Sequence, residues 1–357
     1  MSDRVAAVIV LAAGAGTRMK SAKSKLLHTI GGKTLLAHAI NAVEPLRPEH
    51  LVVVVGHERE SVLTELSRIA PYAQTVVQQE LLGTGDAVRT ALAALPSDLT
   101  GEVAVTYADV PLLEPETLEE LVAAHRDYAN AATLLSAHAD NPSGYGRVVR
   151  DAADPAQVAR IVEHRDATPD ELQITEINAG VYVFDIPTLR SSLGQLTTNN
   201  DQGQLYLTDA IALAREASGR VGAVVTADVW QTEGVNDRVQ LAALTAEYNR
   251  RIVTRWMLAG VTVIDPAATW IDADVDLGQD VTLLPGVELH GVTSIESGAT
   301  IGPSTTLKDC EVGANARVIR VHAELAVIGE GSRVGPFLYL KPGTQIAAGE
   351  RREPATA

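Results

Sequence analysis

Short apolar runs alternate with amphipathic segments over the first two thirds of the chain. Residues 5–13 are continuously small and apolar, as expected of a strand covered on both faces. Four further runs predict strands and three segments between them predict helices: strands at 51–56, 102–108, 131–137 and 179–185, helices at 34–43, 86–94 and 115–128. This alternation predicts a doubly wound α/β domain with a mostly parallel sheet, whose ligand binds at the carboxyl ends of the strands.

A different pattern fills the last third of the chain. A helix is predicted over residues 237–259, and from Ile271 aliphatic residues recur every six positions. After a phase break the same spacing resumes; the full series is Ile271, Leu277, Leu283, Leu289, Ile295, Ile301, Leu307, then Ile328, Val334, Leu340 and Ile346. A sustained period of six predicts a solenoid of about four coils. We therefore expect four segments: an α/β domain (1–236), a linker helix (237–262), a solenoid (263–346) and a small, polar, disordered tail (347–357).

Composition limits the compartment. The chain has 357 residues, 46% of them apolar, which is enough for a large core and two domains. Its one cysteine, Cys310, excludes a disulfide within the chain and favours the reducing cytoplasm. Basic residues follow the first apolar run and no apolar stretch of about 18 residues occurs, so we expect a strand there and no integral membrane association.

The charge is distributed unevenly. The net charge is −16, yet residues 1–43 carry six basic residues against one acidic residue: Arg4, Arg18, Lys20, Lys23, Lys25 and Lys33 against Asp3. A local reversal of this kind predicts a small anionic ligand near the N-terminus. The acidic remainder argues against binding of nucleic acid, which needs an extended basic surface.

The sequence LAAGAGTRM at residues 11–19 directly follows the first predicted strand. Its glycines let backbone N–H groups approach an anion, and Arg18 and Lys25 add positive charge, so Leu11, Ala12, Ala13 and Gly14 are expected to border a triphosphate. The dinucleotide fingerprint would require glycine at Met19, and no P-loop sequence is present nearby. An ordinary strand-to-helix turn is the alternative.

Seven motifs occur in a fixed order: GAGTRM with Lys25, LLGTGDA (81–87), YADVPL (107–112), GYGR (144–147), IVEHRDA (161–167), EINAG (176–180) and EGVNDR (233–238). Together they resemble the bifunctional N-acetylglucosamine-1-phosphate uridyltransferase/glucosamine-1-phosphate acetyltransferase family of bacterial peptidoglycan precursor synthesis. The repeats from Ile271 resemble the left-handed parallel β-helix of hexapeptide acyltransferases. The resemblance covers nearly the whole chain.

This resemblance implies a Mg²⁺-dependent reaction of UTP with N-acetylglucosamine-1-phosphate that yields UDP-N-acetylglucosamine and pyrophosphate. A phosphate monoester is already ionised at pH 7, so catalysis needs alignment and cations more than a base. The implied roles are phosphate binding and catalysis by Arg18 and Lys25, metal binding by Asp109 and Asn236, nucleotide binding by Gln78, Gly83, Thr84 and Tyr107, and sugar binding by Gly146, Glu163 and Asn178. Asp109 also fits an ordinary turn and Asn236 a helix N-cap.

The chain departs from the family pattern at three positions. Ser24 replaces a usual proline, Ala108 a usual glycine and Asp86 a common histidine. We expect Ser24 to loosen the loop at Lys25 and Ala108 to crowd the nucleotide, at the expense of turnover and not of the fold.

The resemblance also implies acetyl transfer at the interfaces of a homotrimer formed through the β-helix. Lys341 matches one position of that acetyltransferase site, but the remaining positions lie beyond residue 357, so we expect no acetyltransferase activity, and trimerisation stays open. Two other functions also remain open: a transferase for glucose-1-phosphate with UTP or dTTP, and a non-catalytic protein that binds nucleotide sugars.

Overall fold

The computed structural model describes residues 4–56, 59–217 and 219–354. The chain forms two compact units. One contains Met1–His28 and Thr34–Leu241, and the other contains Thr29–Lys33 and Ala242–Ala357.

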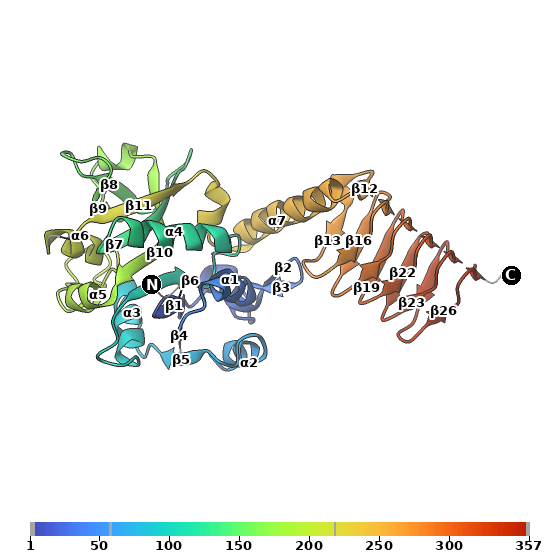
Figure 1. Ribbon diagram of the computed structural model, residues 1–357, viewed down its shortest axis with the longest axis horizontal. Coiled ribbons are helices and arrows are strands. Elements are labelled where there is room, and N and C mark those ends of the chain that lie inside the picture. The colour runs from blue at the N-terminus through green and yellow to red at the C-terminus, as the bar shows by residue number, and fades with distance from the viewer. Residues whose placement is uncertain (1–3, 57–58, 218, 355–357) are drawn as a thin grey trace. The chain divides into compact units, whose positions relative to one another are not determined.

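The first unit is built on a nine-stranded sheet (Figure 1). Its main path runs β11-β7-β10-β6-β1-β4-β5, and β8 and β9 extend it through β10. The strands are β1 (Ala7–Ala12), β4 (His50–Val55), β5 (Gln74–Val77), β6 (Glu102–Tyr107), β7 (Ala132–His138), β8 (Arg147–Arg150), β9 (Val158–Val162), β10 (Glu176–Asp185) and β11 (Val221–Thr226). The central pairs are parallel, whereas β10 runs antiparallel to β6 and β7. The predicted α/β class and mostly parallel sheet are confirmed.

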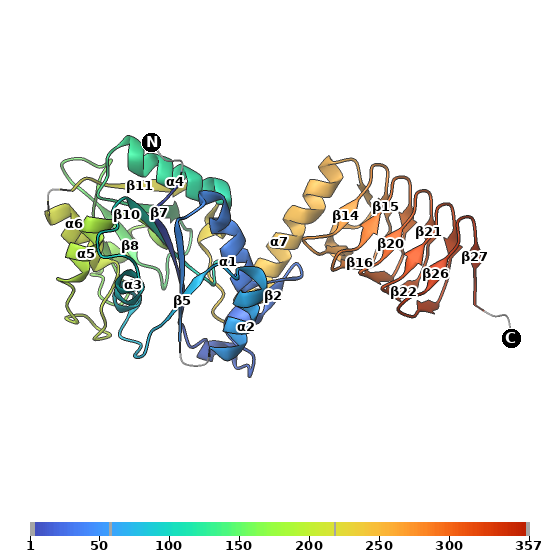
Figure 2. The ribbon, with the colours of Figure 1, turned by 60° about the horizontal axis from the view of Figure 1, so that its bottom comes forward.

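Helices cover both faces of this sheet (Figure 2). One face packs against α1 (Leu35–Val43), α2 (Glu60–Ile69) and α4 (Pro115–Asp127), and the other against α3 (Thr84–Ala93), α5 (Ile186–Leu193) and α6 (Asp209–Glu216). Local signals start several of them: the Thr34 hydroxyl accepts from Ala37 N at the start of α1, and Asp185 caps α5 by accepting from Thr188 N.

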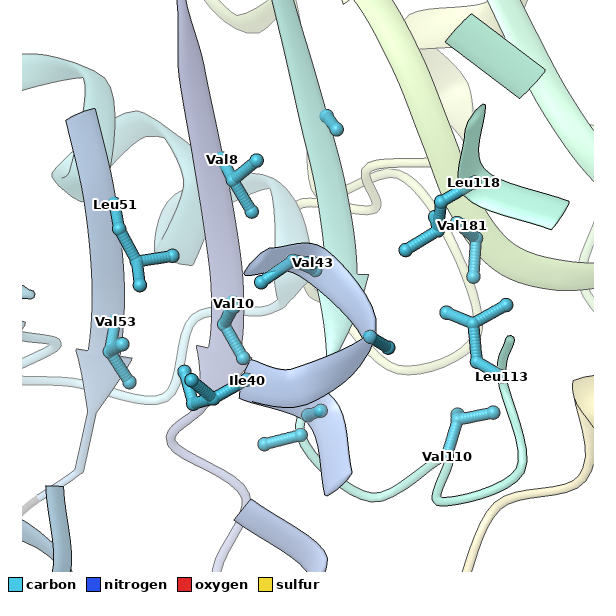
Figure 3. Close-up of a cluster of buried hydrophobic side chains, with 14 of the residues drawn as sticks. Val8, Val10, Ile40, Val43, Leu51, Val53, Val110, Leu113, Leu118 and Val181 are labelled. Atoms are coloured by element: carbon cyan, nitrogen blue, oxygen red, sulfur yellow. The ribbon is translucent and has the colours of Figure 1, made fainter. Parts of the chain in front are cut away.

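Alternate residues of β1 point into the two helix layers. Val8 and Val10 pack with Ile40 and Val43 of α1 (Figure 3), while Ile9 belongs to the cluster on the opposite face. Each such side chain contributes roughly 1.5–3 kcal/mol by burial. This double coverage explains why the run of residues 5–13 is apolar without alternation.

The second unit contains most of α7 (Arg238–Leu258) and a left-handed parallel β-helix, with β2 (Thr29–Ile30) and β3 (Lys33–Thr34) forming a small hairpin. The start of α7 is capped by Asp237, whose Oδ1 accepts from the backbone N–H groups of Val239 and Gln240, both at 2.9 Å. The N-cap alternative for Asn236 is therefore wrong.

The β-helix consists of three ladders of short parallel strands. They are β12 (Thr262–Val263), β15 (Thr282–Leu283), β18 (Thr300–Ile301), β21 (Arg317–Val318), β24 (Arg333–Val334), β27 (Arg351–Arg352); β13 (Trp270–Ile271), β16 (Val287–His290), β19 (Thr305–Lys308), β22 (Val321–Glu324), β25 (Leu338–Leu340); and β14 (Asp276–Leu277), β17 (Ser294–Ile295), β20 (Glu311–Val312), β23 (Val327–Ile328), β26 (Gln345–Ile346). Within the described residues the ladders hold six, five and five strands, which is about five coils between Thr262 and Arg352, where the six-residue period of residues 271–346 predicted about four for that shorter range.

The phase break in the six-residue period has a simple structural cause. The buried positions after Leu307 are Val312, Val318, Ala323 and Ile328, so three of these four steps span five residues instead of six. Strand pairing is kept, because Ile295 pairs with Val312 and Leu307 with Ala323. The missing residues come out of the turns, and the aliphatic interior is continuous.

The disorder predicted for residues 347–357 is wrong for the described part of that segment. Arg351 and Arg352 form β27, which pairs with β24, and Gly335 N donates to Arg352 O at 2.9 Å. An outer strand of a β-helix requires only backbone pairing with the previous coil, so a polar sequence suffices. Residues 355–357 lie outside the described residues. Among the described helices, none has both the length and the apolar character to cross a membrane.

Candidate active site

A cavity of about 270 Å³ opens where β1 and β6 end. These strands are parallel and in register, with Leu11 opposite Tyr107, so the segments that follow them meet at one edge of the sheet. The cavity is lined by Leu11, Ala12, Ala13, Gly14, Lys25, Leu26, Gln78, Leu81, Gly83, Thr84, Ala87, Tyr107, Asp109 and Gln204. The structure thus brings together most of the residues that the sequence predicted for the nucleotide and its phosphates.

The glycine loop after β1 packs closely on the segment that carries Lys25. Gly16 has φ 60°, and a Cβ added to it would lie 2.8 Å from Lys25 Cβ, so both conformation and contact require glycine. A Cβ on Gly14 would meet no atom within 4 Å. The backbone at Gly14 is therefore open to a ligand.

Each of the two predicted catalytic cations contacts one of the two predicted metal ligands. Lys25 Nζ forms an ion pair with Asp109 Oδ2, and the Lys25 side chain is only 8% exposed. Arg18 donates from NH2 to Asn236 Oδ1 at 2.9 Å. Gly234 lies near the side chains of Asp109 and Asn236, and Val235 N donates to Asp109 O at 2.9 Å, which ties the EGVNDR segment to the end of β6.

The donor set here fits a magnesium ion. A Cβ added to Gly234 would lie 3.8 Å from Asp109 Oδ1 and 3.9 Å from Asn236 Nδ2, so the Asp109 carboxylate and the Asn236 carboxamide both lie near Gly234, while the Asn236 oxygen accepts from Arg18. In the described part of the chain, no group of three or more His, Cys, Asp or Glu side chains could hold a metal ion. Mg²⁺ commonly takes one or two oxygen ligands from protein and the rest from phosphate and water, which matches this pair.

The GTG turn at residues 83–85 is held by a distant segment. Leu205 N donates to Leu82 O at 2.7 Å and Gly85 N donates to Leu205 O at 2.8 Å. A Cβ on Gly83 would lie 2.5 Å from Leu205 O, which explains the glycine. The Thr84 hydroxyl accepts from Leu207 N at 3.0 Å, so Thr84 anchors this segment as well as lining the cavity.

The predicted sugar residues lie close together but do not line the cavity. Asn178 N donates to Gly146 O at 2.9 Å, and the Asn178 side chain donates to the Tyr182 hydroxyl at 2.7 Å. Glu163 accepts from the Thr208 hydroxyl at 3.0 Å, and burial raises the pKa of its carboxyl group. Arg18 and Asn236 also lie outside the lining.

Tyr107 connects the two groups of residues. Burial raises the pKa of its hydroxyl, and the nearby charges of Glu163, among the sugar residues, and Asp109, among the phosphate residues, raise it further. Gly180 has φ 76°, and a Cβ there would lie 2.3 Å from Tyr107 Cε2. The EINAG glycine is thus required by the position of Tyr107.

Sequence reasoning missed three residues of this region. Tyr145 donates its hydroxyl hydrogen to Glu233 Oε2 at 2.6 Å, which links the GYGR and EGVNDR motifs, and Gln204 lines the cavity. Tyr145 and Glu233 lie inside motifs that the sequence analysis singled out, so the signal was present. Gln204 lies outside every motif.

The structure describes the surroundings of two departures from the family pattern, Ser24 and Ala108. Ser24 has φ −52° and ψ 140°, values that proline also adopts, and the expectation that it loosens the loop stays a prediction. Ala108 is fully buried in the cluster that includes Val8 and Val110, and it does not line the cavity. The expectation that Ala108 crowds the nucleotide is therefore wrong, because its side chain points into the core.

Comparisons with known proteins agree with this geometry. A family model described as a MobA-like NTP transferase domain matches residues 8–171. The chain also has an overall likeness to a solved structure of UDP-glucose pyrophosphorylase complexed with UDP-glucose, with a TM-score of 0.55 and 17% identity over 69% of this chain and 99% of that one. At this identity the likeness concerns the fold alone.

Curated relatives are much closer in sequence. The chain is 53% identical over 343 residues to the bifunctional protein GlmU of Kineococcus radiotolerans and 55% identical over 343 residues to that of Pseudarthrobacter chlorophenolicus, in both cases covering 96% of this chain and 69% of the relative. It is 54% identical over 348 residues to that of Cutibacterium acnes, covering 96% of this chain and 82% of the relative. With the nucleotidyltransferase fold and the cavity described above, these relationships show that the chain belongs to the bifunctional GlmU family of sugar-1-phosphate uridyltransferases.

Proposed function

We propose that this protein transfers UMP from UTP to N-acetylglucosamine-1-phosphate, giving UDP-N-acetylglucosamine and pyrophosphate for cell-wall precursor synthesis in the cytoplasm. The observation that carries the proposal is the paired arrangement of Lys25 with Asp109 and of Arg18 with Asn236, together with the open backbone at Gly14. Two cations, two oxygen ligands and free backbone amides are the groups that a metal-bound triphosphate needs.

The chain's own residues would act mainly by alignment and charge. Loop amides near Gly14 and the Arg18 guanidinium would hold the β and γ phosphates, and Lys25 would neutralise charge that develops at the α phosphate. Because Lys25 is buried against Asp109, an incoming phosphate must compete with that carboxylate for the ammonium group. When bound at Asp109 and Asn236, Mg²⁺ would neutralise phosphate oxygens.

The two ends of the product would be read by different sides of the site. Gln78 and Gly83 line the cavity and would bind the uracil, with Thr84 and Tyr107 beside them. Gly146, Glu163 and Asn178 would bind the sugar beyond Tyr107. Asn178 uses one amide donor toward Tyr182, and its second N–H remains for an acetamido carbonyl.

The proposal is tested by pyrophosphate release across pairs of nucleoside triphosphate and sugar-1-phosphate, with and without Mg²⁺. We expect release to require Mg²⁺ and to be fastest with UTP and N-acetylglucosamine-1-phosphate. Faster release with glucose-1-phosphate or dTTP would replace the proposed substrates. No release with any pair would leave only a binding role.

Asp109→Asn should lower turnover at least a hundredfold while circular dichroism stays that of the wild type. The matched control is Asp127→Asn, the same change at an exposed position of α4. Turnover of Asp109→Asn within a few-fold of the control would remove Asp109 from the mechanism.

We also propose that the protein assembles as a homotrimer through the β-helix. This unit exposes large apolar side chains, among them Val292, Leu325 and Phe337, at 67%, 55% and 71% exposure. Light scattering should give three times the chain mass of 37.7 kDa. A monomer mass at working concentration would contradict the assembly.

A further inference from the structure

Asp86 is a buried carboxylate next to the cavity but not part of its lining. It lies in the first turn of α3 and is 8% exposed. Its Oδ2 accepts from Gln78 Nε2 at 2.9 Å and its Oδ1 accepts from Arg89 NH2 at 2.6 Å. Asp86 therefore joins a cavity residue to a half-exposed arginine.

These contacts fix the orientation of the Gln78 amide. Gln78 Nε2 lies 2.9 Å from Asp86 Oδ2 and 3.0 Å from Gly83 O, and both of those atoms can only accept. Both N–H bonds of the amide are consequently directed into the protein. The carbonyl oxygen, for which the described residues supply no partner, is the group that Gln78 can offer to a ligand in the cavity.

An amide that can only accept distinguishes pyrimidines. Uracil and thymine carry an N3–H donor, whereas cytosine has an unprotonated N3 that accepts. If Gln78 could rotate by 180°, its NH₂ group would face the cavity and would suit cytosine. The Asp86 carboxylate opposes this rotation, because a Gln78 oxygen in place of the nitrogen would face two acceptors.

We propose that Asp86 is a positioning residue that holds the Gln78 carbonyl toward the base and thereby selects uracil and thymine over cytosine. The inference rests on the proposed function, since it assigns Gln78 to the base of the nucleotide. It adds a residue and a specificity that follow from the hydrogen-bond network alone.

The hydrogen bond from Arg89 to Asp86 provides a test of the proposal. In Asp86→Asn, the Arg89 guanidinium can only donate and favours an oxygen at its side of the new amide, so the amide would turn its oxygen to Arg89 and its NH₂ group to Gln78. A donor at that place favours the rotated Gln78, whose oxygen would then face only one acceptor, Gly83 O, instead of two. Changing Arg89 as well, in Asp86→Asn with Arg89→Met, removes the demand and lets the asparagine present its oxygen to Gln78 again.

The experiment measures equilibrium binding of Mg²⁺ complexes of UTP, dTTP and CTP by titration calorimetry, and kcat/KM for UTP and CTP. We expect the wild type to prefer UTP to CTP, and Asp86→Asn to reduce that preference about tenfold or more, as loss of a charge-assisted hydrogen bond would. Binding of dTTP should weaken in parallel with UTP, because both bases carry the N3–H. The double variant should regain most of the lost preference.

Two controls separate positioning from general damage. Arg89→Met alone should leave the UTP to CTP ratio unchanged. The second control is Glu65→Gln, which removes the carboxylate from the ion pair of Glu65 with Arg68, another i,i+3 pair that lies away from the cavity. Equal losses for all three nucleotides in Asp86→Asn would overturn the proposal, as would a wild type without preference for UTP or without nucleotide binding. A wild type that prefers UTP in calorimetry but releases no pyrophosphate would refute the proposed reaction and leave the role of Asp86 standing.

Discussion

Replacing Lys25 with methionine keeps most of the side-chain volume and removes the charge. Breaking a fully buried ion pair costs about 3–5 kcal/mol, and breaking a surface pair about 0–1 kcal/mol. The side chains of Lys25 and Asp109 are 8% and 22% exposed, so we expect an intermediate loss of about 2 kcal/mol in unfolding free energy. For a unit of this size the melting temperature should fall by about 4–8 °C.

The same change should reduce turnover far more than it reduces stability. Removing one group that stabilises developing charge commonly lowers kcat by about 10²–10³. The assay is pyrophosphate release at a temperature well below the transition, together with thermal unfolding followed by circular dichroism. Lys25→Arg should recover stability and part of the turnover, because it restores a cation.

Lys33→Met is the matched control, since Lys33 forms a more exposed ion pair with Asp274 at 2.8 Å, away from the cavity. It should change stability by less than about 1 kcal/mol and leave turnover unchanged. Turnover of Lys25→Met within tenfold of this control would refute the assignment of Lys25 to the phosphates. A melting temperature equal to that of the wild type would refute the buried ion pair.

Two further changes probe other parts of the chain. Gly180→Ala should lower the melting temperature, because alanine would have to adopt a left-handed φ at a cost of about 1–2 kcal/mol. It should also raise KM for UTP, because the new Cβ would displace Tyr107. A wild-type KM would show that the ring does not shape the site. His290 has a pKa raised above 6.5, first by its hydrogen bond to Asp272 and then by Glu288, so its stabilising contribution is complete below pH 6.5 and is lost as pH rises through the raised pKa. Chemical unfolding of the wild type and of His290→Gln across this range should therefore converge at high pH, and a constant difference would contradict the pairing.

The sequence predicted the elements whose buried side chains all lie in apolar surroundings. Residues 5–13 are apolar because both faces of β1 are covered, and the six-residue series follows from an interior that admits one aliphatic per strand. Within the α/β sheet, strands β5, β8, β9 and β11 were not predicted. Strands β5, β8 and β9 are interrupted or bordered by polar residues, namely Gln74, Gln78, Arg150 and Arg160. The sheet pairs these three strands through backbone hydrogen bonds, which leave no apolar pattern in the sequence.

The candidate site divides in the same way. Gly14 and Asp109 follow parallel strands, so the register of β1 and β6 brings them together as expected. Gln204 reaches the cavity because Leu205 bonds to Leu82 and Gly85, a backbone contact across more than a hundred residues that no sequence spacing reveals. The orientation of Gln78 likewise depends on Asp86 and Gly83, and becomes visible only from their distances.

The five-residue steps in the β-helix have a consequence for how such a chain can change over time. Each shortened turn contains a residue in the left-handed region, at Asp309, Arg320 or Leu325, while the strands on either side remain paired in the same register. Single-residue insertions and deletions can therefore accumulate at the corners without disturbing the interior. An alignment that enforces a strict six-residue repeat would misplace every buried position between Val312 and Ile328. An alignment anchored on the aliphatic interior would place these positions correctly.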